Sequence, residues 1–299
     1  MYVVLGASGN TGHIVAQNLL ARQQKVRVVG RDAAHLQAHA AKGAEIFIAD
    51  VTDAAALTKA FQNADSAYVM IPPNPTSTDP LAYAERAGDA IASALKNGGV
   101  KNVVVLSSFG ADKSERTGPV LGLHELEQKL NQLDGANVLF LRPGYFMENT
   151  LPQVDVISNM GFAAGPVRPD LKLPMIATRD IGAFAAEALL RLDFRGKQTQ
   201  ELLGQRDISY NEVVEIIGKA IGKPDLHYKQ PSDEQVRQGM VQSGMSAQFA
   251  GLILEMAASL NSGYMRPLEP RSSRNTTPTT YENFVAEVFV PAYKQQAAA

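Results

Sequence analysis

Three glycines stand at a spacing that suits the binding of a phosphate group. Gly6, Gly9 and Gly12 lie in the run GASGNTG, directly after a short apolar segment and directly before an amphipathic one. In a strand-to-helix turn of this kind the first glycine permits the bend, the second admits a pyrophosphate, and the third lets the helix approach the strand. Backbone N–H groups at the helix start would face the phosphates. Three side chains of the same run could add donors, namely Ser8, Asn10 and Thr11.

The end of the second apolar segment indicates which dinucleotide would bind. NAD-specific folds place an acidic residue there, which binds the ribose 2′-hydroxyl. Here Gly30 occupies that place and Arg31 follows it. A guanidinium can bind a 2′-phosphate through two hydrogen bonds and stack on adenine, so the pattern favours NADPH over NADH. Asp32 offers an alternative, because it could contact the ribose or cap the next helix.

Two further segment ends complete the expected cofactor site. Asp50 and Val51 follow the third apolar segment, where Asp50 could accept a hydrogen bond from adenine or instead cap the next helix. Ile71 and Pro72 end the fourth segment, at the sheet edge where ligands lie in open α/β folds. The polar loop at 73–80 would form a rim of this site.

The segments that must position these residues alternate between strand-like and helix-like. Apolar runs predict six strands, at 2–5, 26–29, 45–49, 66–71, 103–106 and 137–141. Helix patterns lie between them, at 13–23, 55–62, 83–96 and 121–133. Short apolar strands separated by helices are typical of a parallel sheet covered on both faces. We therefore predict an α/β protein whose residues 1–150 form a doubly wound Rossmann sheet, the NAD(P)-binding domain.

The chain changes character after residue 150. Proline and glycine become denser, and helix patterns follow at 180–192, 209–222 and 232–260. In the second of these, Ser209 and Glu212 form a capping-box pattern. The methionines of the third fit either a core or a soft wall against an apolar ligand. Residues 151–299 are predicted to form a smaller, mostly helical substrate lobe, from which some chain returns to the Rossmann core.

Composition excludes several kinds of site. The 299 residues include no cysteine, which rules out disulfides, thiolate nucleophiles and cysteine-ligated metals. Among the five histidines, only His35 and His39 are one helical turn apart, and we interpret both as solvated residues on a helix face rather than metal ligands. No metal is expected.

Charge and hydropathy bear on partners and location. The net charge of −2 offers no basic surface for nucleic acid or an anionic membrane. No apolar run is long enough to span a bilayer, and no signal-peptide pattern precedes the first strand. We expect a cytoplasmic protein with a small-molecule substrate, acting as a monomer or a homodimer.

Several motifs together resemble the NmrA-like branch of the atypical short-chain dehydrogenases/reductases. They are Gly6–Gly12, Leu106-Ser107-Ser108, His124–Glu127, Leu139–Asn149, Arg179–Gly182 and Thr280–Phe284. The resemblance covers nearly the whole chain. It implies a dinucleotide-binding fold with one of two roles: a reductase of quinones and aromatic compounds, or a redox-sensing regulator that binds the dinucleotide without turnover.

The catalytic acid of typical short-chain dehydrogenases is missing. That acid is a tyrosine with a lysine four residues later, and none of the nine tyrosines here has a lysine at that spacing. His124 stands on the equivalent helix, where the resemblance implies a place near the nicotinamide ribose. It could orient the ring or donate a proton, or it could serve only as a hydrogen-bond partner of cofactor or backbone.

The ends of the fifth and sixth strands supply the remaining candidates. Ser107 and Ser108 stand where the family's catalytic serine often lies, and one of them could bind a substrate carbonyl or simply cap the strand edge. The run Pro143-Gly144-Tyr145-Phe146 should pass beside the nicotinamide. Tyr145 and Phe146 could form a wall for an aromatic substrate or pack between the lobes. The predicted catalytic set is His124, Ser108 and Tyr145.

Two functions follow from this interpretation. The first is an NADPH-dependent reductase that transfers a hydride to a quinone, an enone or a conjugated aromatic. Such acceptors need little acid catalysis, which suits a site without the tyrosine–lysine pair. The alternative is a non-catalytic NADP(H) sensor that binds a protein partner.

Overall fold

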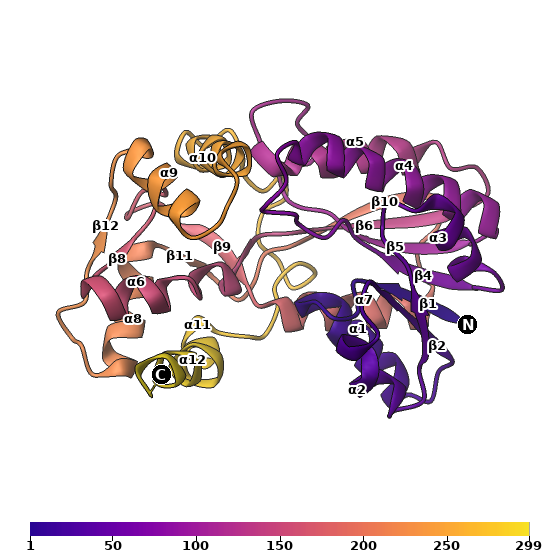
Figure 1. Ribbon diagram of the computed structural model, residues 1–299, viewed down its shortest axis with the longest axis horizontal. Coiled ribbons are helices and arrows are strands. Elements are labelled where there is room, and N and C mark those ends of the chain that lie inside the picture. The colour runs from indigo at the N-terminus through magenta and orange to yellow at the C-terminus, as the bar shows by residue number, and fades with distance from the viewer. Residues whose placement is uncertain (299) are drawn as a thin grey trace.

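Seven parallel strands form the central sheet of the protein. The computed structural model describes residues 1–298 (Figure 1). The strands are β1 (Tyr2–Leu5), β2 (Val26–Gly30), β3 (Glu45–Ile48), β4 (Ser66–Val69), β5 (Asn102–Leu106), β6 (Asn137–Pro143) and β10 (Lys197–Leu202). Their spatial order is β3-β2-β1-β4-β5-β6-β10, and it reverses direction between β1 and β4. This order confirms the predicted doubly wound Rossmann fold.

Helices cover both faces of the sheet because successive strand residues point to opposite sides. Val103 and Val105 belong to one hydrophobic core, while Val104 between them belongs to the other. The first core is covered by α3 (Ala54–Phe61), α4 (Pro80–Gly98) and α5 (Leu121–Asn131), and the second by α1 (Asn10–Ala21) and α7 (Thr178–Arg191). The short helix α2 (Gln37–Ala40) lies near α1 (Figure 1).

The seventh strand, β10, is absent from the sequence prediction. Its sequence, KQTQEL, is polar at five of six positions because it forms the edge of the sheet, and only its last two residues are buried. It pairs in parallel with β6, from Lys197 beside Val138 to Leu202 beside Pro143. The preceding helix α7 packs on α1. A stretch of chain beyond residue 150 is therefore part of the Rossmann unit.

The second lobe lies at the other end of the molecule (Figure 1). Its helices are α6 (Gln153–Met160), α8 (Tyr210–Ile221), α9 (Asp233–Gln242), α10 (Ala247–Asn261), α11 (Tyr281–Phe284) and α12 (Val290–Ala298). Its strands are β7 (Tyr145–Phe146), β8 (Ala163–Ala164), β9 (Leu173–Ile176), β11 (Asp207–Ile208) and β12 (Tyr228–Lys229). They make two small sheets beside the helices. No helix among residues 1–298 is long and apolar enough to cross a membrane.

Helix capping confirms one prediction and corrects another. The Ser209 side chain accepts from the Glu212 N–H, and the Glu212 carboxylate accepts from the Ser209 N–H, so the capping box at the start of α8 is present. The prediction of a single helical segment at 232–260 was wrong. It is divided into α9 and α10, because Ser246 caps a new helix by accepting from the Phe249 N–H at 3.0 Å.

The polar segment at 266–280 runs from the C-terminal lobe along the Rossmann unit and back. The carboxylate of Glu201 on β10 accepts hydrogen bonds from the backbone N–H groups of Leu268 and Glu269. Asp180 on α7 accepts from the N–H and the hydroxyl of Thr279, at 3.0 and 2.7 Å. Two carboxylates of the Rossmann unit thus hold a segment that belongs to the other lobe by sequence.

A buried ion pair fastens α5 to the sheet. Arg142 on β6 donates two hydrogen bonds to Glu127 on α5, at 3.0 and 2.6 Å, and the Ser107 hydroxyl donates to the same carboxylate. The side chains of Glu127 and Arg142 are 3% and 11% exposed. Burial alone would lower the pKa of Arg142, but the hydrogen bonds and charge of Glu127 raise it, so the guanidinium remains charged.

Removing one partner of this pair should destabilise the protein strongly. Glu127→Ala would leave the Arg142 charge buried without compensation, and we expect the free energy of unfolding to fall by roughly 3–5 kcal/mol. Urea denaturation followed by circular dichroism measures it. Glu125→Ala, an exposed position on the same helix, is the matched control and should change stability by less than about 0.5 kcal/mol. Equal stability of the two variants would contradict a structural role for the pair.

Candidate functional site

The glycine run forms a tight turn at the point where the strand order reverses. Gly6 has a φ of +64°, and its carbonyl accepts a hydrogen bond from the Gly9 N–H at 2.9 Å. A Cβ on Gly12 would lie 2.3 Å from that same carbonyl oxygen, so only glycine fits there. The turn places the N-terminus of α1 directly over the end of β1. The N–H groups of the first turn of a helix have no intrahelical partner, and this cradle therefore suits a pyrophosphate.

The three predicted side-chain donors of this run are placed differently from one another. Ser8 and Asn10 are exposed at the turn. Thr11 is buried, and its hydroxyl accepts a hydrogen bond from the Tyr68 hydroxyl at 2.8 Å. Thr11 therefore joins α1 to β4 beneath the turn, whereas Ser8 is available at its surface.

A smaller cavity of about 90 Å³ lies next to the turn. It brings together five residues predicted to bind the cofactor, which are Gly6, Ser8, Arg31, Val51 and Pro72. Gly30 also lines it, at the position where an acid would bind a ribose hydroxyl. Asp32 lies outside its lining, and its carboxylate accepts from the Ala34 N–H at 2.8 Å as a turn cap. The surroundings of Arg31 thus fit the predicted 2′-phosphate site.

Asp50 does not cap the following helix. Its carboxylate accepts hydrogen bonds from the N–H and the hydroxyl of Thr52, at 2.8 and 2.6 Å, and Asp53 caps α3 instead. The hydroxyl of Thr52, with a smaller contribution from the charge of Arg31, lowers the pKa of Asp50. Asp50 is therefore a carboxylate near Arg31, and its predicted contact with adenine stays a prediction.

His39 is not solvated, contrary to the sequence interpretation. It is 1% exposed, and its Nε2 lies 3.0 Å from the carbonyl oxygen of Ala7 in the glycine turn. The same nitrogen lies 3.1 Å from Nδ1 of His13 on α1. The pair of His13 and His39 supports the glycine turn. The spacing of His35 and His39 could not indicate this contact, because His13 lies on a different helix.

A larger cavity of about 270 Å³ lies between the sheet edge and the C-terminal lobe. Seven predicted site residues line it, namely Ile71, Pro72, Ser107, Ser108, Gly144, Tyr145 and Phe146. It shares Met70 and Pro72 with the smaller cavity, so the two adjoin along the carboxyl ends of the strands. Together they offer the extended site that a dinucleotide needs.

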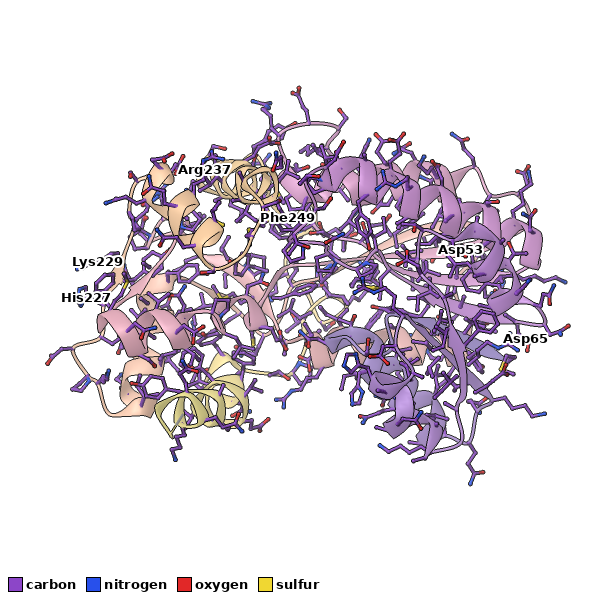
Figure 2. The ribbon with its side chains drawn as sticks, in the orientation of Figure 1. Asp53, Asp65, His227, Lys229, Arg237 and Phe249 are labelled. Atoms are coloured by element: carbon purple, nitrogen blue, oxygen red, sulfur yellow. The ribbon has the colours of Figure 1, made fainter. Side chains whose placement is uncertain are left out.

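One face of α10 forms the opposite wall of the larger cavity. Phe249, Leu252, Met256 and Leu260 line it, at helical spacings of three and four residues, and Figure 2 shows Phe249 between the lobes. Sequence reasoning identified only Met256 of these as a candidate wall residue; Met240 and Met245 do not line the cavity. Nothing in the sequence indicated that this helix would meet the Rossmann edge.

Backbone contacts hold α10 against the Rossmann unit. The Pro75 carbonyl, in the predicted rim loop, accepts from the Ser246 N–H at 2.9 Å. Glu255 accepts from the Gly118 N–H at 3.1 Å, and the Ser259 hydroxyl donates to the Arg116 carbonyl. The helix therefore closes one side of the cavity in a fixed position.

Tyr145 is half-buried and hydrogen-bonded to a buried tyrosine. Its hydroxyl lies 3.0 Å from that of Tyr210, the first residue of α8. Burial raises the pKa of Tyr145, while the hydrogen bond with Tyr210 lowers it by a smaller amount. Burial also raises the pKa of Tyr210 well above its ordinary value. Both hydroxyls are therefore neutral at physiological pH.

The other catalytic candidates have distinct surroundings. Ser107 and Ser108 both line the larger cavity, but the Ser107 hydroxyl donates to Glu127 and the Ser108 hydroxyl donates to the Phe109 carbonyl at 2.9 Å. His124 and Pro143 are outside the cavity lining, and His124 Nδ1 donates to the Ala111 carbonyl at 2.9 Å. That bond leaves Nε2 as the free ring nitrogen, and the catalytic role of His124 stays a prediction.

Comparison with known proteins places this site in a family. Residues 2–285 match the NmrA-like family. The chain is 28% identical over 260 residues to an NAD(P)H azoreductase of Xenophilus azovorans, covering 86% of each chain. It is 25% identical over 268 residues to quinone oxidoreductase 2 of Escherichia coli, covering 88% of this chain and 89% of the relative.

Solved structures share the fold. An NADPH-dependent quinone oxidoreductase of Escherichia coli in complex with NADPH superposes with a TM-score of 0.80 at 23% identity, covering 97% of this chain and 100% of that one. A triphenylmethane reductase of Citrobacter sp. in complex with NADP(H) gives a TM-score of 0.79 at 17% identity, covering 99% of both chains. The family match over nearly the full length agrees with the glycine turn and the strand order, and the chain belongs to the NmrA-like family.

Proposed function

We propose that this protein is an NADPH-dependent oxidoreductase that reduces a small acceptor such as a quinone, an enone or a conjugated aromatic. The observation that carries the proposal is the pair of adjoining cavities at the point where the strand order reverses. One has a phosphate-binding turn and an arginine, and the other is an apolar pocket closed by α10. The azoreductase and the quinone oxidoreductase among the relatives support a reductase.

The residues of the smaller cavity fit the adenosine and pyrophosphate part of NADPH. The first-turn N–H groups of α1 would bind the pyrophosphate, and the absence of a Cβ at Gly9 would leave room for it. Arg31 would bind the 2′-phosphate. The nicotinamide would then lie in the larger cavity, beside Pro72, Ser108 and Gly144. When bound, NADPH supplies a hydride from its nicotinamide ring.

Tyr145 is the residue of the larger cavity best placed to assist the acceptor. A single hydrogen bond joins the two facing hydroxyls, so one of them donates and the other accepts. Tyr145 is the only hydrogen-bond partner of the Tyr210 hydroxyl within residues 1–298. If Tyr145 donated, the buried hydrogen of Tyr210 would lack an acceptor, which is costly. Tyr210 therefore donates to Tyr145, and Tyr145 keeps its own hydrogen for an oxygen atom of the acceptor. This hydrogen bond would stabilise the negative charge that the oxygen gains on reduction, until water protonates it.

Loss of NADPH absorbance over a panel of quinones, enals and aromatic dyes tests the function directly. We expect steady turnover with at least one quinone, and faster turnover with NADPH than with NADH. Tight binding of NADPH with no turnover on any acceptor would instead support the sensor, which the absence of a tyrosine–lysine pair favours.

Arg31 should determine the preference for NADPH. We expect Arg31→Ala to weaken NADPH binding by about 1–3 kcal/mol, since a charge-assisted contact to the 2′-phosphate is lost, and to leave NADH binding nearly unchanged. Isothermal calorimetry measures both. Arg237→Ala, on α9 in the other lobe (Figure 2), removes the same charge away from the site and should bind both dinucleotides as the wild type does. Equal losses for NADPH and NADH would overturn the assignment of Arg31.

Tyr145→Phe should lower kcat for a quinone about tenfold, the equivalent of one hydrogen bond, without weakening NADPH binding. Because the folded-state pKa of Tyr145 is raised above 10.0, its hydroxyl stays protonated, and we expect no alkaline decline from this group below pH 10. Tyr228→Phe is the matched control: Tyr228 stacks on Tyr210, but its hydroxyl donates to the Val167 carbonyl. A Tyr145→Phe enzyme with wild-type kcat would remove Tyr145 from the mechanism.

A further inference from the structure

The larger cavity has no charged side chain in its lining. Across residues 1–298, the side chains that line it are apolar except for six uncharged polar ones, which are Asn74, Tyr83, Ser107, Ser108, Tyr145 and Asn149. The Ser107 hydroxyl is already committed to Glu127. The cavity therefore offers hydrogen bonds to a neutral polar atom, and it offers no counter-ion to a charged group.

Three charged side chains near the cavity are engaged with other groups. Arg142 lies beneath Ser107, but it is bound to Glu127 by two hydrogen bonds. Arg116 belongs to the loop next to the cavity, and its guanidinium lies 4.2 Å from the centroid of the Tyr264 ring rather than in the lining. Glu255 precedes Met256 on α10 and accepts from the Gly118 N–H, so the charge beside this wall is negative.

The α10 wall has the composition of a surface that accepts flat apolar molecules. Phe249 supplies an aromatic ring, and Met256 supplies a flexible thioether that adapts to an irregular shape. Met265, from the segment after α10, continues the same wall. The hydrogen bonds to the backbone of Pro75, Gly118 and Arg116 fix the position of α10, so these side chains face the larger cavity.

From these observations we infer that the cavity-facing side of α10 selects the acceptor, and that it selects an uncharged planar ring and rejects an anionic one. The inference rests on the proposed function and names the substrate class of that site. A sulfonate or carboxylate on the acceptor would have to lose its hydration without gaining a counter-ion, which opposes binding. A neutral ring carrying a carbonyl oxygen would lose little, since Tyr145 and Asn149 offer it hydrogen bonds.

The test compares two acceptors that differ in one charge, 1,4-naphthoquinone and its 2-sulfonate. Their binding is measured by calorimetry with the protein saturated with 1,4,5,6-tetrahydro-NADP, whose nicotinamide ring is uncharged and transfers no hydride, and NADPH oxidation is measured separately. We expect the sulfonate to bind roughly 100-fold more weakly than the neutral quinone. Binding of the two within threefold of each other, or binding of neither, would overturn the inference.

A charge placed on the α10 wall should weaken this selection. Met256→Lys puts an ammonium group into the cavity on a side chain of similar length, and we expect it to strengthen sulfonate binding at least about tenfold. Met256→Leu should retain the preference for the neutral quinone. Ala258→Lys adds the same charge at an exposed position of the same helix and should leave both affinities unchanged. If Ala258→Lys strengthens sulfonate binding as much as Met256→Lys, general attraction rather than the cavity wall is responsible.

Two safeguards separate the possible failures. If Met256→Lys unfolds, as judged by circular dichroism, Leu252→Lys on the same face provides the same test one turn earlier. If the neutral quinone binds and the sulfonate does not, yet NADPH is never oxidised, the proposed reductase function fails while the selection by α10 stands. If NADPH is oxidised by both quinones at equal kcat/KM and both bind equally, the function stands and the inference fails.

Discussion

The structure depends on the close approach of α1 to β1 at Gly12. A Cβ at that position would collide with the Gly6 carbonyl, so the side-chain-free backbone lets the helix begin directly above the strand end. Because of this contact, the N–H groups of the first helical turn are exposed and Ser8 lies at the surface of the glycine turn. The Thr11–Tyr68 hydrogen bond and the His13–His39 pair then hold the turn from beneath. The phosphate-binding end of the site is therefore rigid because its support is buried.

The other end of the site is assembled from both lobes. The Rossmann unit contributes strand ends at Pro72, Ser108 and Gly144, and the C-terminal lobe contributes α10. Tyr145 lies where the two lobes meet, on the short strand β7. Its hydroxyl is hydrogen-bonded to that of Tyr210, the first residue of α8. The ion pair of Glu127 and Arg142 fixes the sheet side of this arrangement. A ligand in the larger cavity would lie between the sheet edge and a helix that is held to the Rossmann unit by hydrogen bonds of Ser246, Glu255 and Ser259.

The sequence predicted those features of the structure that depend on residues close to one another in the chain. Six of the seven strands of the main sheet, the glycine turn, the capping box at Ser209 and the strand-end residues all follow from periodicity and residue type. The seventh strand was missed because a polar edge strand has no apolar run. The burial of His39 and the α10 wall were missed because each depends on a partner distant in sequence. The break at Ser246 was overlooked although its N-cap residue was present, since the apolar pattern continues across it.

The route of the chain between the lobes has a consequence for how such proteins can diversify. The segment beyond residue 150 supplies α7 and the edge strand β10 to the Rossmann unit, and the segment at 266–280 is bound by Glu201 and Asp180 of that unit. The C-terminal lobe is thus interwoven with the sheet and cannot be exchanged as a cassette without removing part of it. On the proposed function, a change of acceptor would instead come from single substitutions among the side chains that line the larger cavity, those of α10 included, since each alters the pocket and leaves the interwoven scaffold intact.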